Sequence, residues 1–271
     1  MKKLLGAILT GALALTLCAC GKDKNKLIVG TNAAFPPFEY EDLNGNITGF
    51  DMDLIKGYGE SVGKKVVIKN MDFDAALTSA STGKIDIAIA GITKNEKREK
   101  TLSFSDGYYT SNQVVVLSTT TAEEINTQTA TLSEDEKIEY IINYLEGKKI
   151  GVQRATTGQY YVEGDPDWEF DGIKDAKKNG LCRPYDNGGL AIMDLNAGKI
   201  DAVVLDEAPA KNIVSKNYST TLSILDCALT NEEYAIAVKK GNTELVDSLN
   251  AYIKTIKANG EFDTLLNKYF G

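Results

Sequence analysis

The chain has 271 residues, 43% of them hydrophobic, and a formal net charge of −8. The apolar fraction is ordinary for a globular protein, and the negative charge argues against nucleic acid as a partner, because phosphate binding depends on clustered Lys and Arg. The sequence has no histidine, which removes Ser-His-Asp and Cys-His catalysis and most zinc sites. We expect neither a cofactor nor a metal.

Residues 1–19 have the build of a secretory signal peptide, in which two lysines precede an apolar stretch too short to remain as a membrane-spanning helix. The run Leu17-Cys18-Ala19-Cys20-Gly21 resembles the lipobox of bacterial lipoproteins. Cys20 is therefore the expected lipidation site, and residues 20–26 form a polar tether ahead of the fold. A signal peptide that is cleaved without lipidation is the alternative.

The first half of the folded chain predicts strands that alternate with helices. Phe35 and Phe38 flank two prolines on a stiff loop, where each is expected either in the core or facing a ligand. Asn44-Gly45 predicts a hairpin turn and no calcium loop, and Phe73 is placed on a loop. Strand, helix and strand in succession favour a parallel sheet. The expected elements are strands 27–30, 65–70 and 85–90 and helices 51–62 and 75–82.

The stretch from Gly83 to Tyr109 predicts a strand that ends at an anion site. Alternating isoleucines stop at Gly91, and Thr93 is the expected N-cap of a short helix in 94–100. Free backbone N–H groups and the Arg98 guanidinium together suit a carboxylate. Spacing alone leaves equally open that Arg98 is one more solvated cation.

The second half repeats the pattern. Gly83-Lys84-Ile85-Asp86 recurs as Gly198-Lys199-Ile200-Asp201 in the same helix-to-strand position. Residues 118–135 are rich in Thr, Ser and Glu and are expected to form a surface excursion. Cys182 and Cys227 are either a disulfide or two buried thiols. The expected elements are strands 113–117, 148–153, 181–185, 200–205 and 234–238 and helices 138–145, 159–162, 189–196, 245–256 and 261–270.

The two repeats offer charges of opposite sign at the carboxyl edges of two sheets, where ligands bind. The first strand leads to Thr93 and Arg98, and the second ends at Asp206. A cleft with a fixed cation on one wall and a fixed anion on the other is complementary to a zwitterion such as an α-amino acid. An amino acid is therefore the expected ligand.

Several motifs, in this order, resemble those of the bacterial extracellular solute-binding proteins, family 3, the amino-acid-binding receptors of ABC importers. The likeness covers essentially the whole mature chain. The motifs are Phe35-Pro-Pro-Phe38-Glu39, Gly49-Phe50-Asp51-Met52-Asp53-Leu54, Ala90-Gly91-Ile92-Thr93 with Arg98, Phe104-Ser105-Asp106-Gly107-Tyr108-Tyr109, Ala202-Val203-Val204-Leu205-Asp206 and Lys268-Tyr269-Phe270-Gly271.

The resemblance implies an α/β fold of the type II periplasmic-binding-protein class, with a ligand cleft between two lobes joined by two hinge crossovers. Lobe 1 would comprise residues 27–110 plus 235–271, and lobe 2 residues 111–234. The crossovers would lie near 108–112 and 232–236. The chain would be a monomer, anchored outside the cytoplasm by its lipid, with permease and ATPase subunits of an ABC transporter as partners.

The resemblance also implies the roles of individual residues. Asp206 and the Ala90 backbone would hold the ligand ammonium, and Arg98, Thr93, Thr156 and Thr157 its carboxylate, with the side chain between Phe35 and Phe73. Asn32 stands where several cation-binding members are acidic, which puts an arginine or lysine preference in doubt. The aromatic faces suit a guanidinium or a planar amide, so arginine, lysine, glutamine and cystine all stay open. The full expected set is Asn32, Phe35, Phe73, Ala90, Gly91, Thr93, Arg98, Gln153, Thr156, Thr157 and Asp206.

Two other functions fit the same fold. Some of its members are dehydratases of the prephenate or arogenate type, in which a carboxylic acid in the cleft protonates a leaving hydroxyl. A ligand sensor without a transporter is the other. Lipidation together with a complete zwitterion site favours a binding protein over an enzyme.

Overall fold

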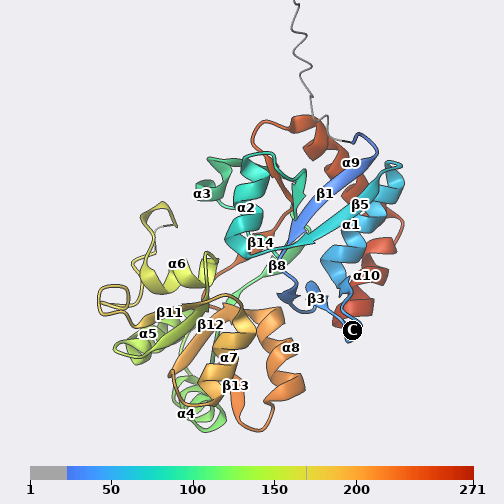
Figure 1. Ribbon diagram of the computed structural model, residues 1–271. Helices are drawn as coiled ribbons and strands as arrows, with labels where there is room; N and C mark the ends of the chain where they lie inside the picture. Colours follow the sequence, from blue (N-terminus) through green and yellow to red (C-terminus); the bar gives the residue numbers. More distant parts are fainter. Residues whose placement is uncertain (1–22, 169) are drawn as a thin grey trace, which may run out of the picture.

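The computed structural model describes residues 23–168 and 170–271. The expected signal peptide and Cys20 lie outside these residues. The chain forms two α/β lobes, seen one above the other in Figure 1, with two antiparallel strands running between them. The two-lobed α/β fold expected from the sequence is confirmed.

The sheet of the first lobe has five strands in the order β5-β1-β6-β15-β7. β1 pairs in parallel with β5 and β6, whereas β15 is antiparallel to β6 and β7. The parallel sheet predicted from the sequence is thus mixed, because β15 enters from the distant C-terminal part of the chain. The strands are β1 (Lys26–Thr31), β5 (Lys65–Asn70), β6 (Ile87–Ala88), β7 (Leu102–Phe104) and β15 (Ala237–Lys239).

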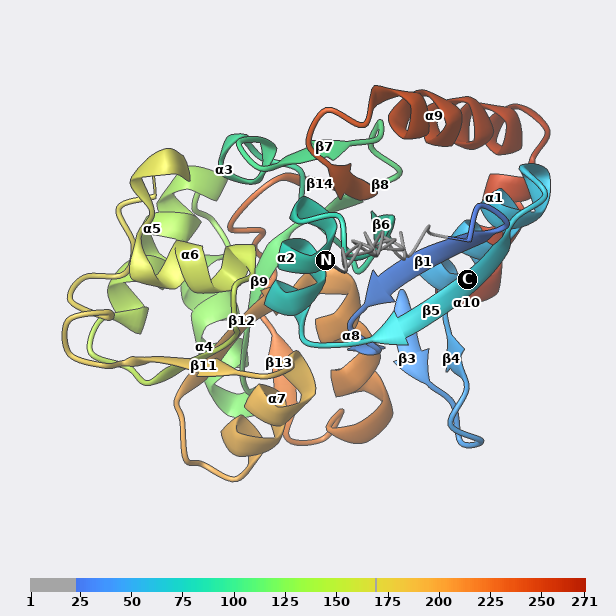
Figure 2. The same cartoon turned by 45° about the horizontal axis from the view of Figure 1, so that its top comes forward.

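Helices cover this sheet, and the last two return to it from the C-terminal end of the chain (Figures 1 and 2). A small sheet of three strands, β2-β3-β4, turns at the expected Asn44-Gly45 hairpin. Phe73 is the first residue of its helix and not on a loop. The elements are α1 (Phe50–Ser61), α2 (Phe73–Ser81), α3 (Glu96–Glu99), α9 (Thr243–Ala258), α10 (Glu261–Phe270), β2 (Ala34–Phe35), β3 (Glu39–Glu41) and β4 (Ile47–Thr48).

The second lobe has the sheet order β11-β10-β12-β9-β13, again mixed, with β9 antiparallel to β12 and β13. Every residue of β10 and β12 is buried, as expected for central strands that read as apolar runs. The strands are β9 (Gln113–Ser118), β10 (Ile150–Gln153), β11 (Cys182–Tyr185), β12 (Ala202–Asp206) and β13 (Leu222–Ile224).

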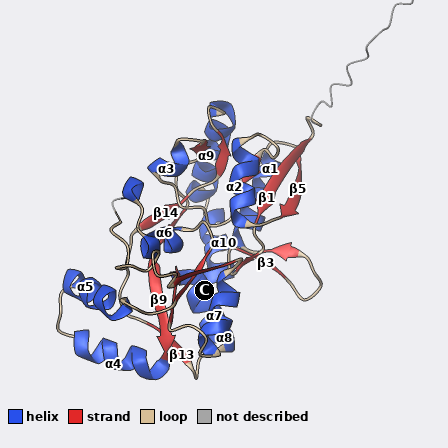
Figure 3. Cartoon of the chain, turned by 60° about the vertical axis from the view of Figure 1, so that its left-hand side comes forward, coloured by secondary structure: helices blue, strands red, loops and turns tan. Residues whose placement is uncertain are grey.

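The prediction that residues 118–135 form an irregular surface excursion is wrong, because most of the segment is helical. This segment contains α4 (Thr119–Thr129), which Ser118 caps by accepting a hydrogen bond from the Thr121 N–H. α4 buries Ala122 and Ile125 and lies at the far end of the lobe beside α5 (Glu134–Leu145) (Figure 3). The remaining helices are α6 (Thr157–Glu163), α7 (Gly188–Asn196), α8 (Glu207–Asn217) and the 3₁₀ turn η1 (Pro166–Trp168).

Two crossover strands connect the lobes, β8 (Tyr109–Ser111) and β14 (Glu232–Tyr234), which pair with each other. The single strand predicted at 234–238 is therefore two strands, because the chain leaves the crossover ladder at Tyr234 and joins the first sheet at Ala237.

Cys182 and Cys227 are both free and buried, so the structure has the two thiols and not the disulfide. Both belong to one apolar cluster of the second lobe. Burial raises the pKa of the Cys182 thiol to about 12 and also raises that of Cys227. Neither thiol is therefore activated for exchange, which requires the thiolate.

Candidate functional site

A narrow cavity of about 10 Å³ lies where the two lobes meet, and all eleven residues expected at the site line it. They come from both lobes, and every one of them is buried. The sequence missed a twelfth lining residue, Glu39. A ligand can therefore reach this cavity only if the lobes part. The lining residues are Asn32, Phe35, Glu39, Phe73, Ala90, Gly91, Thr93, Arg98, Gln153, Thr156, Thr157 and Asp206.

Arg98 is the cationic wall. Its backbone N–H donates to the side chain of Asn95, which is the N-cap of α3; Thr93, the expected cap, is not. The Arg98 guanidinium donates through Nη1 to the Thr93 carbonyl at 2.7 Å and through Nη2 to the Ala155 carbonyl at 3.1 Å. It also lies 5.3 Å from the ring centroid of Phe73. Arg98 is thus a buried cation held by both lobes and not a solvated one.

Two threonines meet beside this guanidinium. Thr157 Oγ1 lies 3.3 Å from Thr93 Oγ1, and the Thr93 hydroxyl donates to Glu232 Oε2 at 2.6 Å. Thr156 donates to the Gln153 carbonyl at 2.8 Å. Hydroxyls and a guanidinium gathered in this way can surround a carboxylate with charge-assisted hydrogen bonds.

Asp206 is the anionic wall. It is the last residue of β12, and its carboxylate accepts hydrogen bonds from the hydroxyls of Tyr234 and Ser111. Burial, and then the nearby Glu232 carboxylate, raise the pKa of Asp206 to about 7. An ammonium group placed beside Asp206 would remove this cost, because an opposite charge favours the ionised form.

Gly91 makes the turn between these walls possible. Its φ is +54°, and a Cβ added there would lie 2.7 Å from Cε1 of Phe35. Its N–H donates to Asp51 Oδ2 at 3.0 Å. The turn that carries Ala90 and Thr93 into the cavity therefore requires glycine at this position.

Replacing Gly91 with alanine is expected to lower the free energy of unfolding by about 1–3 kcal/mol and to weaken ligand binding, since it adds backbone strain and a clash with Phe35. Gly45→Ala is the matched control, because Gly45 has φ +78° with no atom within 4 Å of the added Cβ. Urea unfolding of both variants measures the effect. Equal losses in the two variants would show that the contact with Phe35 is unimportant.

Three further polar residues, Asn32, Gln153 and Glu39, line the cavity. Gln153 Nε2 donates to Asn32 Oδ1 at 3.2 Å, and Asn32 Nδ2 donates to the Met71 carbonyl at 3.0 Å. Glu39 is fully buried, and neither of its carboxyl oxygens receives a hydrogen bond from an N–H or O–H donor in the described residues. The available sequence signal for this residue was its place directly after Phe38, at the end of the motif Phe35–Glu39.

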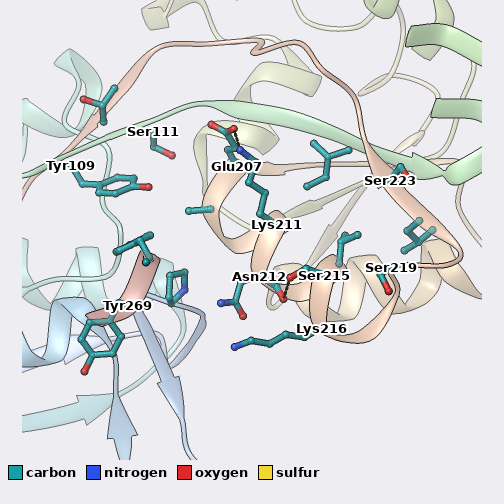
Figure 4. Close-up of a pocket in the computed structure, with 18 residues that line it drawn as sticks. Tyr109, Ser111, Glu207, Lys211, Asn212, Ser215, Lys216, Ser219, Ser223 and Tyr269 are labelled. Carbon is teal, nitrogen blue, oxygen red and sulfur yellow. Dashed lines mark hydrogen bonds and ion pairs between the residues drawn. The ribbon is translucent and has the colours of Figure 1, made fainter. Parts of the chain in front are cut away.

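A second cavity, of about 1010 Å³, opens between α8 and the end of α10 (Figure 4). None of the expected site residues lines it. Its lysine nearest the crossover, Lys211, pairs with Glu207 of the same helix. The smaller cavity is thus the one that brings the predicted charges together.

The model of the bacterial extracellular solute-binding proteins, family 3, matches residues 27–271. Among similar proteins, the L-arginine-binding protein of Pseudomonas aeruginosa is 30% identical over 100% of this chain and 97% of its own length. The arginine-binding extracellular protein ArtP of Bacillus subtilis is 27% identical over 100% and 98%. The L-cystine-binding protein TcyJ of Escherichia coli is 26% identical over 92% and 84%.

Similar proteins are also found among solved structures. An ancestral arginine-binding protein bound to arginine superposes with a TM-score of 0.75 and 36% identity, covering 92% of this chain and 99% of the other. An ancestral arginine-binding protein bound to glutamine has a TM-score of 0.74 and 34% identity over 92% and 99%. An ancestral amino acid-binding protein that is a precursor of cyclohexadienyl dehydratase has a TM-score of 0.71 and 29% identity over 91% and 96%. The chain belongs to the bacterial extracellular solute-binding proteins, family 3.

Proposed function

We propose that this chain binds a cationic L-amino acid, with L-arginine as the first candidate, and delivers it to an ABC importer. The observation that carries the proposal is the charge set of the cavity: Arg98 opposite two buried acidic side chains, Asp206 and Glu39. An amino acid with a cationic side chain matches all three, because it has one negative and two positive groups.

The proposed roles follow from the contacts. Arg98, Thr93, Thr156 and Thr157 take the ligand carboxylate, and Asp206 with the Ala90 backbone takes the ammonium. The side chain lies between Phe35 and Phe73, whose faces attract a guanidinium through cation–π contact, and ends at Glu39. Asn32 and Gln153 supply amide groups at the same end. Glu39 provides the acidic group that Asn32 lacks.

Neutral polar ligands are the second candidate. The Asn32 and Gln153 amides can pair with the side chain of glutamine, and Gln153 Oε1 accepts no hydrogen bond from the described residues. One structural neighbour is an ancestral arginine-binding protein bound to arginine and another is one bound to glutamine, and a relative is an L-cystine-binding protein. Glutamine and cystine therefore belong in any ligand screen of this chain.

The ligand would enter by a hinge motion of lobe 1 (residues 27–110 plus 235–271) against lobe 2 (residues 111–234), with β8 and β14 as the hinge. Across the cleft, Lys97 pairs with the buried Asp165, and Lys100 lies 2.9 Å from Asp167. These pairs join α3 to the loop that carries η1. They would form only on closure, so ligand-dependent compaction in solution scattering is expected.

The site would be held outside the cytoplasm by a lipid on Cys20, as a monomer that docks on permease and ATPase subunits. Members of the family are extracellular or periplasmic, and among residues 23–168 and 170–271 no helix is long and apolar enough to cross a membrane. Incorporation of a labelled acyl chain that is lost in Cys20→Ala would support the anchor. Equal labelling of both proteins would contradict it.

We infer that the chain binds its ligand and does not turn it over. A prephenate-type substrate has two carboxylates and no ammonium, so it would meet the acidic side chains of Asp206 and Glu39 with Arg98 as the one cation among the lining residues. Consumption of prephenate by the purified chain would overturn this inference and favour the dehydratase function. One structural neighbour is an ancestral amino acid-binding protein that is a precursor of such an enzyme.

The test of the proposed function is a thermal shift screen of the chain from Gly21 onward, which contains every residue that the structure describes. The ligands are the twenty amino acids with ornithine, citrulline and cystine. A ligand at about 100 times its Kd stabilises a protein by about 2.7 kcal/mol. The largest shift is expected with arginine, lysine or ornithine, whereas no shift from a folded chain would favour the enzyme or a sensor of another ligand.

A further inference from the structure

Glu39 makes an unusual contact for a fully buried carboxyl group. No N–H or O–H donor in the described part of the chain reaches either of its oxygens. A second buried carboxyl, Asp51 of α1, lies next to it: the Asp51 N–H donates to the carbonyl of Phe38, the residue before Glu39, at 2.9 Å. Asp51 Oδ1 likewise has no hydrogen-bond partner in the described residues, and the two carboxyls act on each other electrostatically. Two carboxylate oxygens repel each other when both are charged, so such a contact is stable only if one of them carries a proton.

The surroundings of Asp51 decide which group holds this proton. Asp51 Oδ2 accepts hydrogen bonds from the Gly91 N–H at 3.0 Å and from the Tyr108 hydroxyl at 2.9 Å. Both bonds favour the ionised form of Asp51. Glu39 has no comparable donors, and burial raises its pKa well above the usual value, with Asp51 as the next cause. The donors at Asp51 therefore favour a proton on Glu39 over a proton on Asp51.

Other titratable groups lie around the same cavity. Asp206 faces it across the cavity and raises its pKa further. Arg98 lines the same cavity, but its guanidinium donates hydrogen bonds to the carbonyl oxygens of Thr93 and Ala155. Tyr108 is neutral, since burial raises its pKa well above the usual value. Glu232 accepts a hydrogen bond from the Thr93 hydroxyl, and the Tyr234 hydroxyl donates one to Asp206.

The pair belongs to one lobe. Glu39, Asp51, Gly91 and Tyr108 all precede the first crossover strand, β8. Parting of the lobes would leave their mutual contacts in place. The proton on Glu39 is thus a property of the ligand-free site and not of closure.

We propose that Glu39 and Asp51 form a proton-sharing pair that sets the side-chain specificity of the site: a cationic side chain binds with loss of the Glu39 proton, and a neutral amide side chain binds with the proton retained. In the first case the Glu39 O–H bond breaks, the proton passes to solvent, and an ion pair forms. In the second, the Glu39 hydroxyl donates to the amide oxygen. This proposal rests on the proposed function, and it makes Asp51 a positioning residue that acts through Glu39.

The pH dependence follows from the proton balance. Because a cationic ligand must expel one proton, its Kd increases by up to about tenfold per unit fall in pH wherever empty Glu39 is protonated. A neutral side chain expels none. Asp206 also titrates near pH 7, but it faces the ammonium that both kinds of ligand share, so its effect cancels in a ratio of two affinities.

The test is calorimetric titration of the chain with L-arginine and with L-citrulline, which replaces the guanidinium by a neutral urea group, between pH 5 and 8. Buffers of different ionisation enthalpy give the number of protons released. We expect arginine to release about one proton more than citrulline, and the citrulline-to-arginine ratio of Kd to fall as pH falls. Equal proton release by the two ligands at every pH would overturn the proposal.

Substitutions at Glu39 and Asp51 test which carboxyl group carries the proton. Glu39→Gln should abolish the difference in proton release and make the Kd ratio independent of pH. Asp51→Asn should lower the pH at which the ratio changes while arginine still binds. Glu41→Gln is the matched control, because Glu41 lies two residues away on β3, is exposed and contacts Asn70. Absence of any arginine binding would contradict the proposed function, whereas binding without the extra proton would contradict only the pair.

Discussion

Replacing Arg98 with alanine is expected to weaken L-arginine binding by at least about tenfold. The substitution removes the cation that would face the ligand carboxylate, and truncating one partner of a buried, hydrogen-bonded charge pair costs about 2–5 kcal/mol, where each 1.4 kcal/mol is a factor of about ten in Kd. It also removes the hydrogen bond from Arg98 to the Ala155 carbonyl of the other lobe. Calorimetry of the variant measures both losses together.

Two controls separate charge from fold. Arg154→Ala removes an exposed guanidinium from the turn next to Ala155, where it pairs with Asp186 on the surface, and should leave Kd unchanged. Arg98→Lys keeps the charge but loses the two-pronged geometry, so intermediate binding is expected. An Arg98→Ala chain that is folded and binds arginine normally would remove Arg98 from the site.

Replacing Asp206 with asparagine is expected to act in opposite directions on binding and on stability. Binding should weaken by at least about tenfold, since the ligand ammonium loses its buried partner. The ligand-free chain, by contrast, should become more stable at pH 8. The pKa of Asp206 is raised to about 7 by burial, so the folded state binds its proton more tightly than the unfolded state, and its ionisation destabilises the fold above that pH.

The sign of the pH effect can be checked directly. Between pH 4 and pH 7 the unfolded chain has lost the Asp206 proton and the folded chain retains it, so this group lowers the free energy of unfolding as pH rises through that window. Thermal unfolding from pH 5 to 8 should show a smaller decline for Asp206→Asn than for the unmodified chain. Asp186→Asn, on the surface beside Arg154, should show the full decline.

The sequence predicted the βαβ units of both lobes because each unit is local, whereas β7, β13 and α8 were not predicted. The recurrence of the sequence Gly83–Asp86 at Gly198–Asp201 indicated that the chain has two similar halves. The direction of β9 and β15 could not be predicted, since both strands enter their sheets by crossovers that join distant parts of the chain. α4 was missed because its Thr-rich composition resembles a loop, whereas burial of Ala122 and Ile125 decides its state.

Most of the residues that line the cavity could be predicted from the sequence, but the electrostatics of the cavity could not. All eleven expected residues line one cavity, and their roles in binding stay a prediction. Glu39 was missed although it ends the motif that begins at Phe35, because only the folded chain shows that it pairs with Phe35 across β2 and β3 and points inward. Its contact with Asp51 likewise depends on packing between a strand and a helix that sequence spacing does not specify.

The most direct test of the central claim is calorimetric titration of the chain with L-arginine at pH 8, beside agmatine, which has the guanidinium without the carboxylate. The account predicts one arginine site per chain and at least about tenfold weaker binding of agmatine, because Arg98 then lacks its partner. Equal affinity for the two compounds, or no heat from a folded chain with either arginine or lysine, would contradict an interlobe site for a cationic amino acid.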